Sequence, residues 1–143
     1  MQGKVLKLYI TKADKEKSKE SKKSITIDKE GVQGDKFYEK DPQRAILITT
    51  IQSYDLAKKN GIELQEGALG ENILIDINPY HLLPGETLQI GELSLEITQN
   101  CTLCKGLSNL NSKLPKLLKD DRGIFAKIRG ESSSITIGDP VVI

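Results

Sequence analysis

The sequence contains few of the residues on which several common functions depend. Its 143 residues include no Trp, two Phe, two Cys and a single His. So few aromatic side chains give little support for a platform that stacks single-stranded nucleic acid. A catalytic triad has only His81 to draw on, and the chain contains neither a phosphate-binding P-loop nor a serine nucleophile elbow. Its chemistry must therefore depend on other residues.

Long apolar runs are also absent. The longest span only a few residues, such as 45–48, which is too short for a transmembrane helix. The N-terminus leads into a strand-like segment rather than the apolar stretch of a signal peptide. We therefore expect a cytoplasmic protein, and the length predicts a single domain over residues 1–143.

Charge is balanced over the chain but not along it. The formal net charge is +1, yet residues 60–104 contain seven acids and no Lys or Arg, whereas residues 105–130 contain seven bases and two acids. One interpretation is a set of solvated faces. The other is that the basic segment helps to hold an anionic ligand. The near-neutral isoelectric point gives nucleic acid little support as a partner.

Many short apolar segments separated by turn residues predict a mainly β fold, a barrel or closed sheet with a few short helices. Thr50 is expected to cap a helix over 51–60, and Ser112 to cap another around 114–119. Residues 12–23, rich in Lys, are expected to form an exposed loop. The predicted strands cover residues 5–10, 24–27, 44–49, 73–77, 87–90, 93–98, 124–128, 134–137 and 141–143.

Both cysteines lie in the segment Cys101-Thr-Leu-Cys104, directly after a predicted strand. A zinc site needs four ligands, and the single histidine leaves a Cys/His set one ligand short. A dithiol redox pair suits the spacing, although Gly106 disfavours the long helix that usually follows such a pair. A single thiolate that binds a soft metal or carries sulfur is a third possibility, and buried packing cysteines are a fourth.

Three polar features accompany the cysteines. The glycine turn Gly31-Val-Gln-Gly34-Asp35 either offers backbone N–H groups to an anion or simply turns a hairpin. Glu71 and Asn72 lie at the start of a predicted strand, where Glu71 is either a general base or a turn residue. Arg44 opens an apolar strand and needs an anionic partner, either a bound phosphate or the carboxylate of Asp35.

Taken in order, these segments resemble the MOSC domain, the module at the C-terminal end of molybdenum cofactor sulfurases that also occurs as small bacterial proteins. The resemblance extends nearly from end to end. It rests on the motifs Gly31-Val-Gln-Gly34-Asp35, Arg44-Ala-Ile-Leu-Ile, Gly67-Ala-Leu-Gly70-Glu71-Asn72-Ile73, Gly85-Glu-Thr-Leu-Gln-Ile-Gly91, Cys101-Thr-Leu-Cys104, Arg122-Gly123-Ile-Phe-Ala-Lys127 and Gly138-Asp139.

The resemblance implies a barrel-like fold with a site for a pterin molybdenum cofactor. It assigns Cys104 as the metal ligand and catalytic thiolate, whereas Cys101 falls where the family is variable. It also implies that the residues around the phosphate and pterin are Gly34, Asp35, Arg44, Glu71, Asn72, Arg122, Gly123 and Lys127. Phe37 occupies a position where members of the family often have His.

The leading hypothesis is therefore a molybdenum-cofactor protein that transfers sulfur or reduces N-hydroxylated small molecules. The pyridoxal-phosphate domain of full sulfurases is missing from this chain, so sulfur or electrons must come from a partner protein. Three alternatives remain open. The chain is a non-catalytic carrier of the cofactor, a CxxC dithiol redox protein, or a structural interaction domain.

Overall fold

The computed structural model describes residues 1–12, 19–101 and 110–143. Its strands are β1 (Gln2–Thr11), β2 (Lys19–Lys22), β3 (Ser24–Asp28), β4 (Gly31–Val32), β5 (Ile46–Thr50), β6 (Ile73–Ile75), β7 (Thr87–Ile90), β8 (Leu93–Asn100), β9 (Ile124–Arg129), β10 (Ser133–Thr136) and β11 (Pro140–Val142). The helices of the described residues are η1 (Pro42–Arg44), α1 (Ile51–Lys59) and α3 (Leu114–Leu117).

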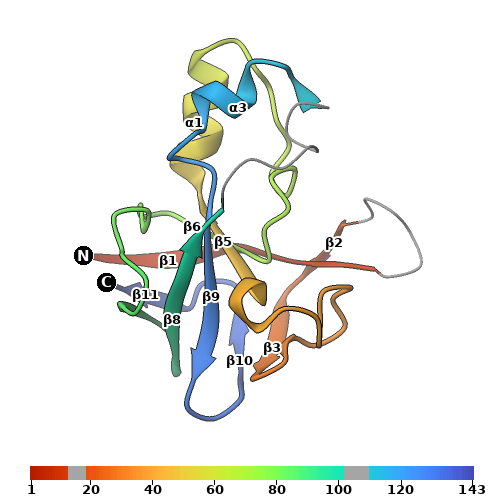
Figure 1. The fold of residues 1–143 in the computed structure, drawn as a ribbon, viewed down its shortest axis with the longest axis vertical. Helices are drawn as coiled ribbons and strands as arrows, with labels where there is room; N and C mark the ends of the chain where they lie inside the picture. Colours follow the sequence, from red (N-terminus) through yellow and green to blue (C-terminus); the bar gives the residue numbers. More distant parts are fainter. Residues whose placement is uncertain (13–18, 102–109) are drawn as a thin grey trace.

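Seven strands form a mixed barrel, which confirms the predicted mainly β fold. Their order is β11-β7-β8-β9-β5-β6-β1, and pairing of β11 with β1 closes the ring. The β5–β6 pair is parallel and α1 provides the crossover between its strands, whereas the other pairs are antiparallel. The two chain ends consequently lie side by side (Figure 1), and the Met1 amino group donates to the Ile143 carbonyl at 3.1 Å.

Buried and more exposed residues alternate along the strands, and the buried ones form the core. In β8, every second residue from Leu93 to Ile97 is buried, so one face of the strand points into the barrel. A second apolar cluster joins α1 to α3 outside the barrel, with Tyr54 and Ala57 packed beside Leu114 and Leu118. Figure 1 shows these two helices together at one end of the molecule.

The structure corrects three local predictions. Lys19–Lys22 form β2 and pair with the end of β1, so the expected loop over 12–23 is wrong for these four residues. Arg44 ends η1 rather than opening a strand, because Asp41 caps this turn through a 2.9 Å bond from the Gln43 N–H. Ser112 does not cap α3, whose first flanking residue is Lys113.

Other local predictions are confirmed. Thr50 caps α1 by accepting a hydrogen bond from the Gln52 N–H. Residues 87–90 and the strand that follows them form the expected hairpin. Gly31 and Gly34 have φ angles of 122° and 85°, so the turn between them does require the left-handed region that glycine adopts.

Candidate functional site

A cavity of about 440 Å³ opens beside the barrel, next to η1. Its volume falls in the range typical of small-ligand sites. The apolar part of its wall includes Leu47 and Phe125, which lie on the outward faces of the neighbouring strands β5 and β9. The complete lining consists of Phe37, Lys40, Asp41, Arg44, Ala45, Leu47, Leu69, Gly70, Asn72, Cys101, Arg122 and Phe125.

The charged lining is mainly cationic. Lys40, Arg44 and Arg122 contribute positive charge, and Asp41 is the single carboxylate among the described lining residues. Arg122 is only 8% exposed, so its guanidinium is largely withdrawn from solvent. Charges in a cleft that excludes water interact more strongly than charges at an open surface, and this cavity therefore favours an anionic ligand.

One polar contact in the cavity joins Arg122 to Cys101. The Nη1 of Arg122 donates to the Cys101 sulfur at 2.6 Å, while Nη2 donates to the Leu69 carbonyl at 3.2 Å. Cys101 is buried, and its backbone N–H donates to the Gly123 carbonyl at 2.9 Å. That bond links the chain leaving β8 to the chain entering β9, and it places the cysteine and the arginine next to each other.

Arg44 does not pair with Asp35, one of the two anionic partners considered for it. Its guanidinium lies over the Phe125 ring, 4.9 Å from the ring centroid, in a cation–π contact. No ion pair of Arg44 is found among the described residues. The contact holds Arg44 against the cavity wall and leaves its charge available to a ligand.

Asp35 instead forms hydrogen bonds within the fold. It is buried, and its Oδ1 accepts from the Thr11 N–H at 2.7 Å and from the Asn72 Nδ2 at 3.2 Å. Asn72 lines the cavity, but its amide is used internally as well. The Asn72 Oδ1 accepts from the Leu47 N–H at 3.1 Å, and Nδ2 also donates to the Tyr9 carbonyl at 3.3 Å. These bonds hold the chain before β6 against both β5 and β1.

Glu71 has no exposed surface and lies behind the cavity wall. Its Oε2 accepts hydrogen bonds from the Thr49 hydroxyl at 2.7 Å and from the Tyr54 hydroxyl at 2.5 Å. Its Oε1 has no hydrogen-bond partner among the described residues. Burial, followed by the charge of Glu71, raises the pKa of the Tyr54 phenol far above its ordinary value. The phenol therefore stays protonated and continues to donate to Glu71.

Lys19, on the unforeseen strand β2, lies beside the same turn. Its Nζ donates to the carbonyls of Gly70 and Glu71, at 2.9 and 3.2 Å. Desolvation by burial lowers the pKa of Lys19, although the charges of Asp35 and Glu71 oppose this shift. Pairing of β2 with β1 is what brings this amine to the turn.

Besides Asp35 and Glu71, three further predicted site residues lie outside the cavity lining. Gly34 is exposed in the turn after β4. Gly123 allows close packing, because a Cβ there would lie 2.9 Å from the Leu47 Cδ1 and 3.3 Å from the Ile48 carbonyl oxygen. Lys127 lies farther along β9, with its Nζ 3.8 Å from a Glu96 carboxylate oxygen. The structure therefore brings Arg44, Asn72 and Arg122 together around one cavity, with Glu71 and Asp35 behind it.

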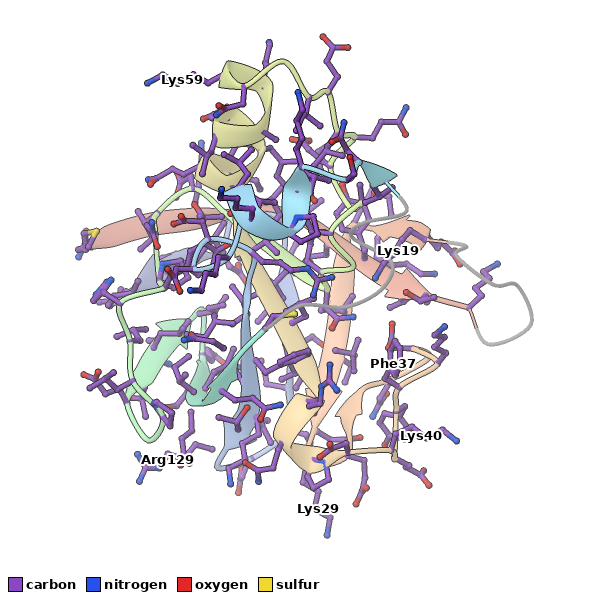
Figure 2. The ribbon with its side chains drawn as sticks, turned by 45° about the horizontal axis from the view of Figure 1, so that its top comes forward. Lys19, Lys29, Phe37, Lys40, Lys59 and Arg129 are labelled. Carbon is purple, nitrogen blue, oxygen red and sulfur yellow. The ribbon has the colours of Figure 1, made fainter. Side chains whose placement is uncertain are left out.

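Cys104, the predicted catalytic and metal-binding residue, lies outside the described residues. Sequence reasoning missed Lys40, Lys19 and the contact between Cys101 and Arg122. The contact between Cys101 and Arg122 could be found only by pairing two predicted strands. Cys101 follows one of them and Arg122 precedes the other, so the two residues meet once these strands pair. Phe37 lines the mouth of the cavity and is 52% exposed. Figure 2 shows it with Lys40 on one side of the molecule, far from Lys59 and Arg129.

Comparison with known families identifies the class of this fold. The sequence profile of the MOSC domain matches residues 33–142, so the chain belongs to the MOSC domain family. The matched range includes every described residue that lines the cavity. No curated protein sequence matches the chain.

Solved structures share the same architecture. The YuaD protein from Bacillus subtilis superposes with a TM-score of 0.84 at 19% identity, covering 99% of this chain and 94% of that one. YiiM from Escherichia coli gives a TM-score of 0.73 at 17% identity, covering 99% and 69%. YiiM from Geobacillus stearothermophilus gives 0.67 at 17% identity, covering 98% and 72%. No helix in the described part of the chain is long and apolar enough to cross a membrane.

Proposed function

We propose that this chain binds a molybdenum cofactor in the cavity beside η1 and uses it to transfer sulfur or to reduce N-hydroxylated small molecules. The observation that carries the proposal is the cluster of Arg44, Arg122 and Lys40 around a cavity that also contains a cysteine sulfur. Membership of the MOSC family supports the choice of cofactor.

The donor set fits the chemistry of such a group. Arginine side chains recognise phosphate through charge-assisted hydrogen bonds, and Arg122 is already oriented by its bonds to Cys101 and Leu69. A thiolate is a soft ligand that suits a metal held by sulfur, and the family resemblance assigns this role to Cys104. The apolar wall, which includes Leu47 and Phe125, would exclude water from the ligand.

When bound, the cofactor would supply the redox or sulfur chemistry, and the chain would orient it and its substrate. Reduction of an N-hydroxylated compound to the amine consumes two electrons and two protons and releases water. A partner protein would have to deliver the electrons, or the sulfur in the case of sulfur transfer. In this proposal Arg44 and Arg122 hold the anionic part of the cofactor.

Reconstitution tests the proposal. The purified chain is mixed under anaerobic conditions with molybdenum cofactor released from a donor molybdoprotein, desalted, and analysed for retained molybdenum. We expect the wild-type chain to retain molybdenum, and Arg122→Gln and Cys104→Ser to retain far less. Lys59→Gln, which removes a charge at the distant end of α1, should behave like wild type.

The reconstituted chain is then assayed with an N-hydroxylated base and a chemical electron supply. Turnover that Cys104→Ser abolishes supports reduction. Retained molybdenum without turnover or sulfur transfer would instead favour a cofactor carrier. A wild-type chain that retains no more molybdenum than Arg122→Gln would contradict cofactor binding in this cavity.

A further inference from the structure

Cys101 has surroundings that packing alone does not require. Its sulfur lines the cationic cavity and accepts a hydrogen bond from the buried Arg122 guanidinium at 2.6 Å. Leu47 and Phe125 supply the apolar contacts around it. A cysteine that only filled space would need no guanidinium, and burying the charge of Arg122 costs free energy unless anionic or polar groups compensate it.

Among the described residues, charged side chains of the cavity lining surround the sulfur. The charged side chains that line it with Cys101, within the described residues, are Lys40, Asp41, Arg44 and Arg122. Cations therefore outnumber the single carboxylate, and the nearest of them contacts the sulfur directly. A guanidinium at hydrogen-bond distance stabilises negative charge on sulfur, which is the form of cysteine that reacts with electrophiles.

We propose that Cys101, held by Arg122, is a reactive thiolate and a modification site for small electrophiles that are neutral or anionic. This role is separate from the metal-binding role that the family resemblance gives to Cys104, and it needs no molybdenum. Hydrogen peroxide is one reagent of this class. The Cys101 sulfur attacks one peroxide oxygen, so that an S–O bond forms as the O–O bond breaks. Sulfur loses two electrons and becomes sulfenic acid, and the other oxygen leaves as hydroxide, which solvent protonates.

The surroundings of Cys101 determine which reagents can reach its sulfur. The residue is only 4% exposed, so a reagent reaches the sulfur through the cavity rather than from the open surface. Burial limits access to the sulfur, and the cationic lining attracts anions. Cys101 therefore differs from an exposed thiol, which would not favour an anionic reagent over a neutral one of the same size.

Two alkylating reagents of similar size test this difference. In Cys104→Ser, Cys101 is the only cysteine, so the site of reaction is unambiguous. The rates with iodoacetate and with iodoacetamide are measured on the folded chain and again in denaturant. We expect the ratio of the iodoacetate rate to the iodoacetamide rate to be about tenfold higher in the folded chain than in denaturant. This factor is at the low end of the range that charge focusing in clefts achieves. Peroxide followed by dimedone should add a sulfenic-acid adduct at Cys101, detected by mass spectrometry.

Matched variants show whether the preference of Cys101 for iodoacetate comes from the positive charge of the cavity or only from exposure of the thiol. Arg122→Gln should abolish the preference for iodoacetate, and Arg44→Gln, which leaves the Cys101 contact in place, should reduce it. Lys59→Gln should leave it unchanged. A Cys101 that reacts only after unfolding would overturn the proposal, and so would equal iodoacetate-to-iodoacetamide ratios in the folded and denatured chain. If Cys104→Ser does not fold, the same ratio is read from the Cys101 peptide of the wild-type chain.

Discussion

Glu71 is a carboxyl residue with no exposed surface, and within the described part of the chain two hydroxyl groups, not a cation, bond to its side chain. Thr49 and Tyr54 both donate to its Oε2. Because a buried charge without hydrogen bonds is costly, these two donors are necessary for the turn that forms one wall of the cavity.

Tyr54 is therefore expected to be a large contributor to stability. Tyr54→Phe removes the donor to Glu71 and also the acceptor of the Gly67 and Leu69 N–H groups. Loss of buried partners typically costs about 1–3 kcal/mol. We expect Tyr54→Phe to lower the free energy of unfolding by at least that range, measured by urea denaturation.

Tyr38 provides the matched control, because its hydroxyl also donates to a carboxylate, Asp28 at 2.6 Å, but near the surface. Tyr38→Phe should destabilise the chain far less than Tyr54→Phe. Equal losses for the two variants would show that burial of Glu71 does not depend on the Tyr54 hydroxyl.

At the scale of elements, close strand packing explains why glycine precedes β9. Gly123 has no positive φ, so its backbone conformation does not demand glycine. The requirement is space, because an added Cβ would lie 2.9 Å from the Leu47 Cδ1. This residue was predicted as a cofactor contact. The structure places it outside the cavity lining, where its missing Cβ allows β5 and the chain entering β9 to approach closely.

Gly123→Ala is expected to destabilise the chain through overpacking. Extra atoms in a well-packed site typically cost about 1–3 kcal/mol. The cost should fall when Leu47→Ala removes the side chain that is struck, which a double-mutant cycle of unfolding free energies measures. Additive effects of the two substitutions would contradict this packing argument.

The elements that the sequence predicted well are those determined locally. Thr50 precedes an amphipathic segment and caps α1, and the Thr87–Ile90 hairpin follows from alternation and a glycine turn. Strand β2 could not be predicted in this way, because its charged residues are ordered by pairing with the end of β1. The contact between Cys101 and Arg122 likewise depends on the pairing of β8 with β9, which local sequence does not encode.

At the scale of the whole molecule, burial or hydrogen bonding involves every tyrosine of the chain. The chain has four, and all have a raised pKa. Desolvation, supported by the charge of Glu71, raises the pKa of Tyr9 from 10.0 to about 12. A hydrogen bond to Asp28 is the largest cause that raises the pKa of Tyr38 to about 12.

These shifts predict alkaline unfolding. Below pH 10 the folded and the unfolded chain both keep their phenolic protons, so the contribution of the tyrosines to the free energy of unfolding is fully present. Between about pH 10 and 12 the unfolded chain releases protons that the folded chain keeps, so the free energy of unfolding falls as pH rises. Absorbance at 295 nm should show little tyrosinate at pH 11 until the chain unfolds. Tyrosine titration near pH 10 in the folded chain would contradict the burial described here.

The central claim is that the cationic cavity beside η1 holds a molybdenum cofactor. Native mass spectrometry of the chain, purified anaerobically from molybdenum-replete cells, tests it most directly. The account predicts a bound mass equal to a single molybdenum cofactor in the wild-type chain and in Lys59→Gln, and its loss in the double variant Arg44→Gln/Arg122→Gln. A wild-type chain that carries no such mass, or a double variant that carries it unchanged, would contradict the account.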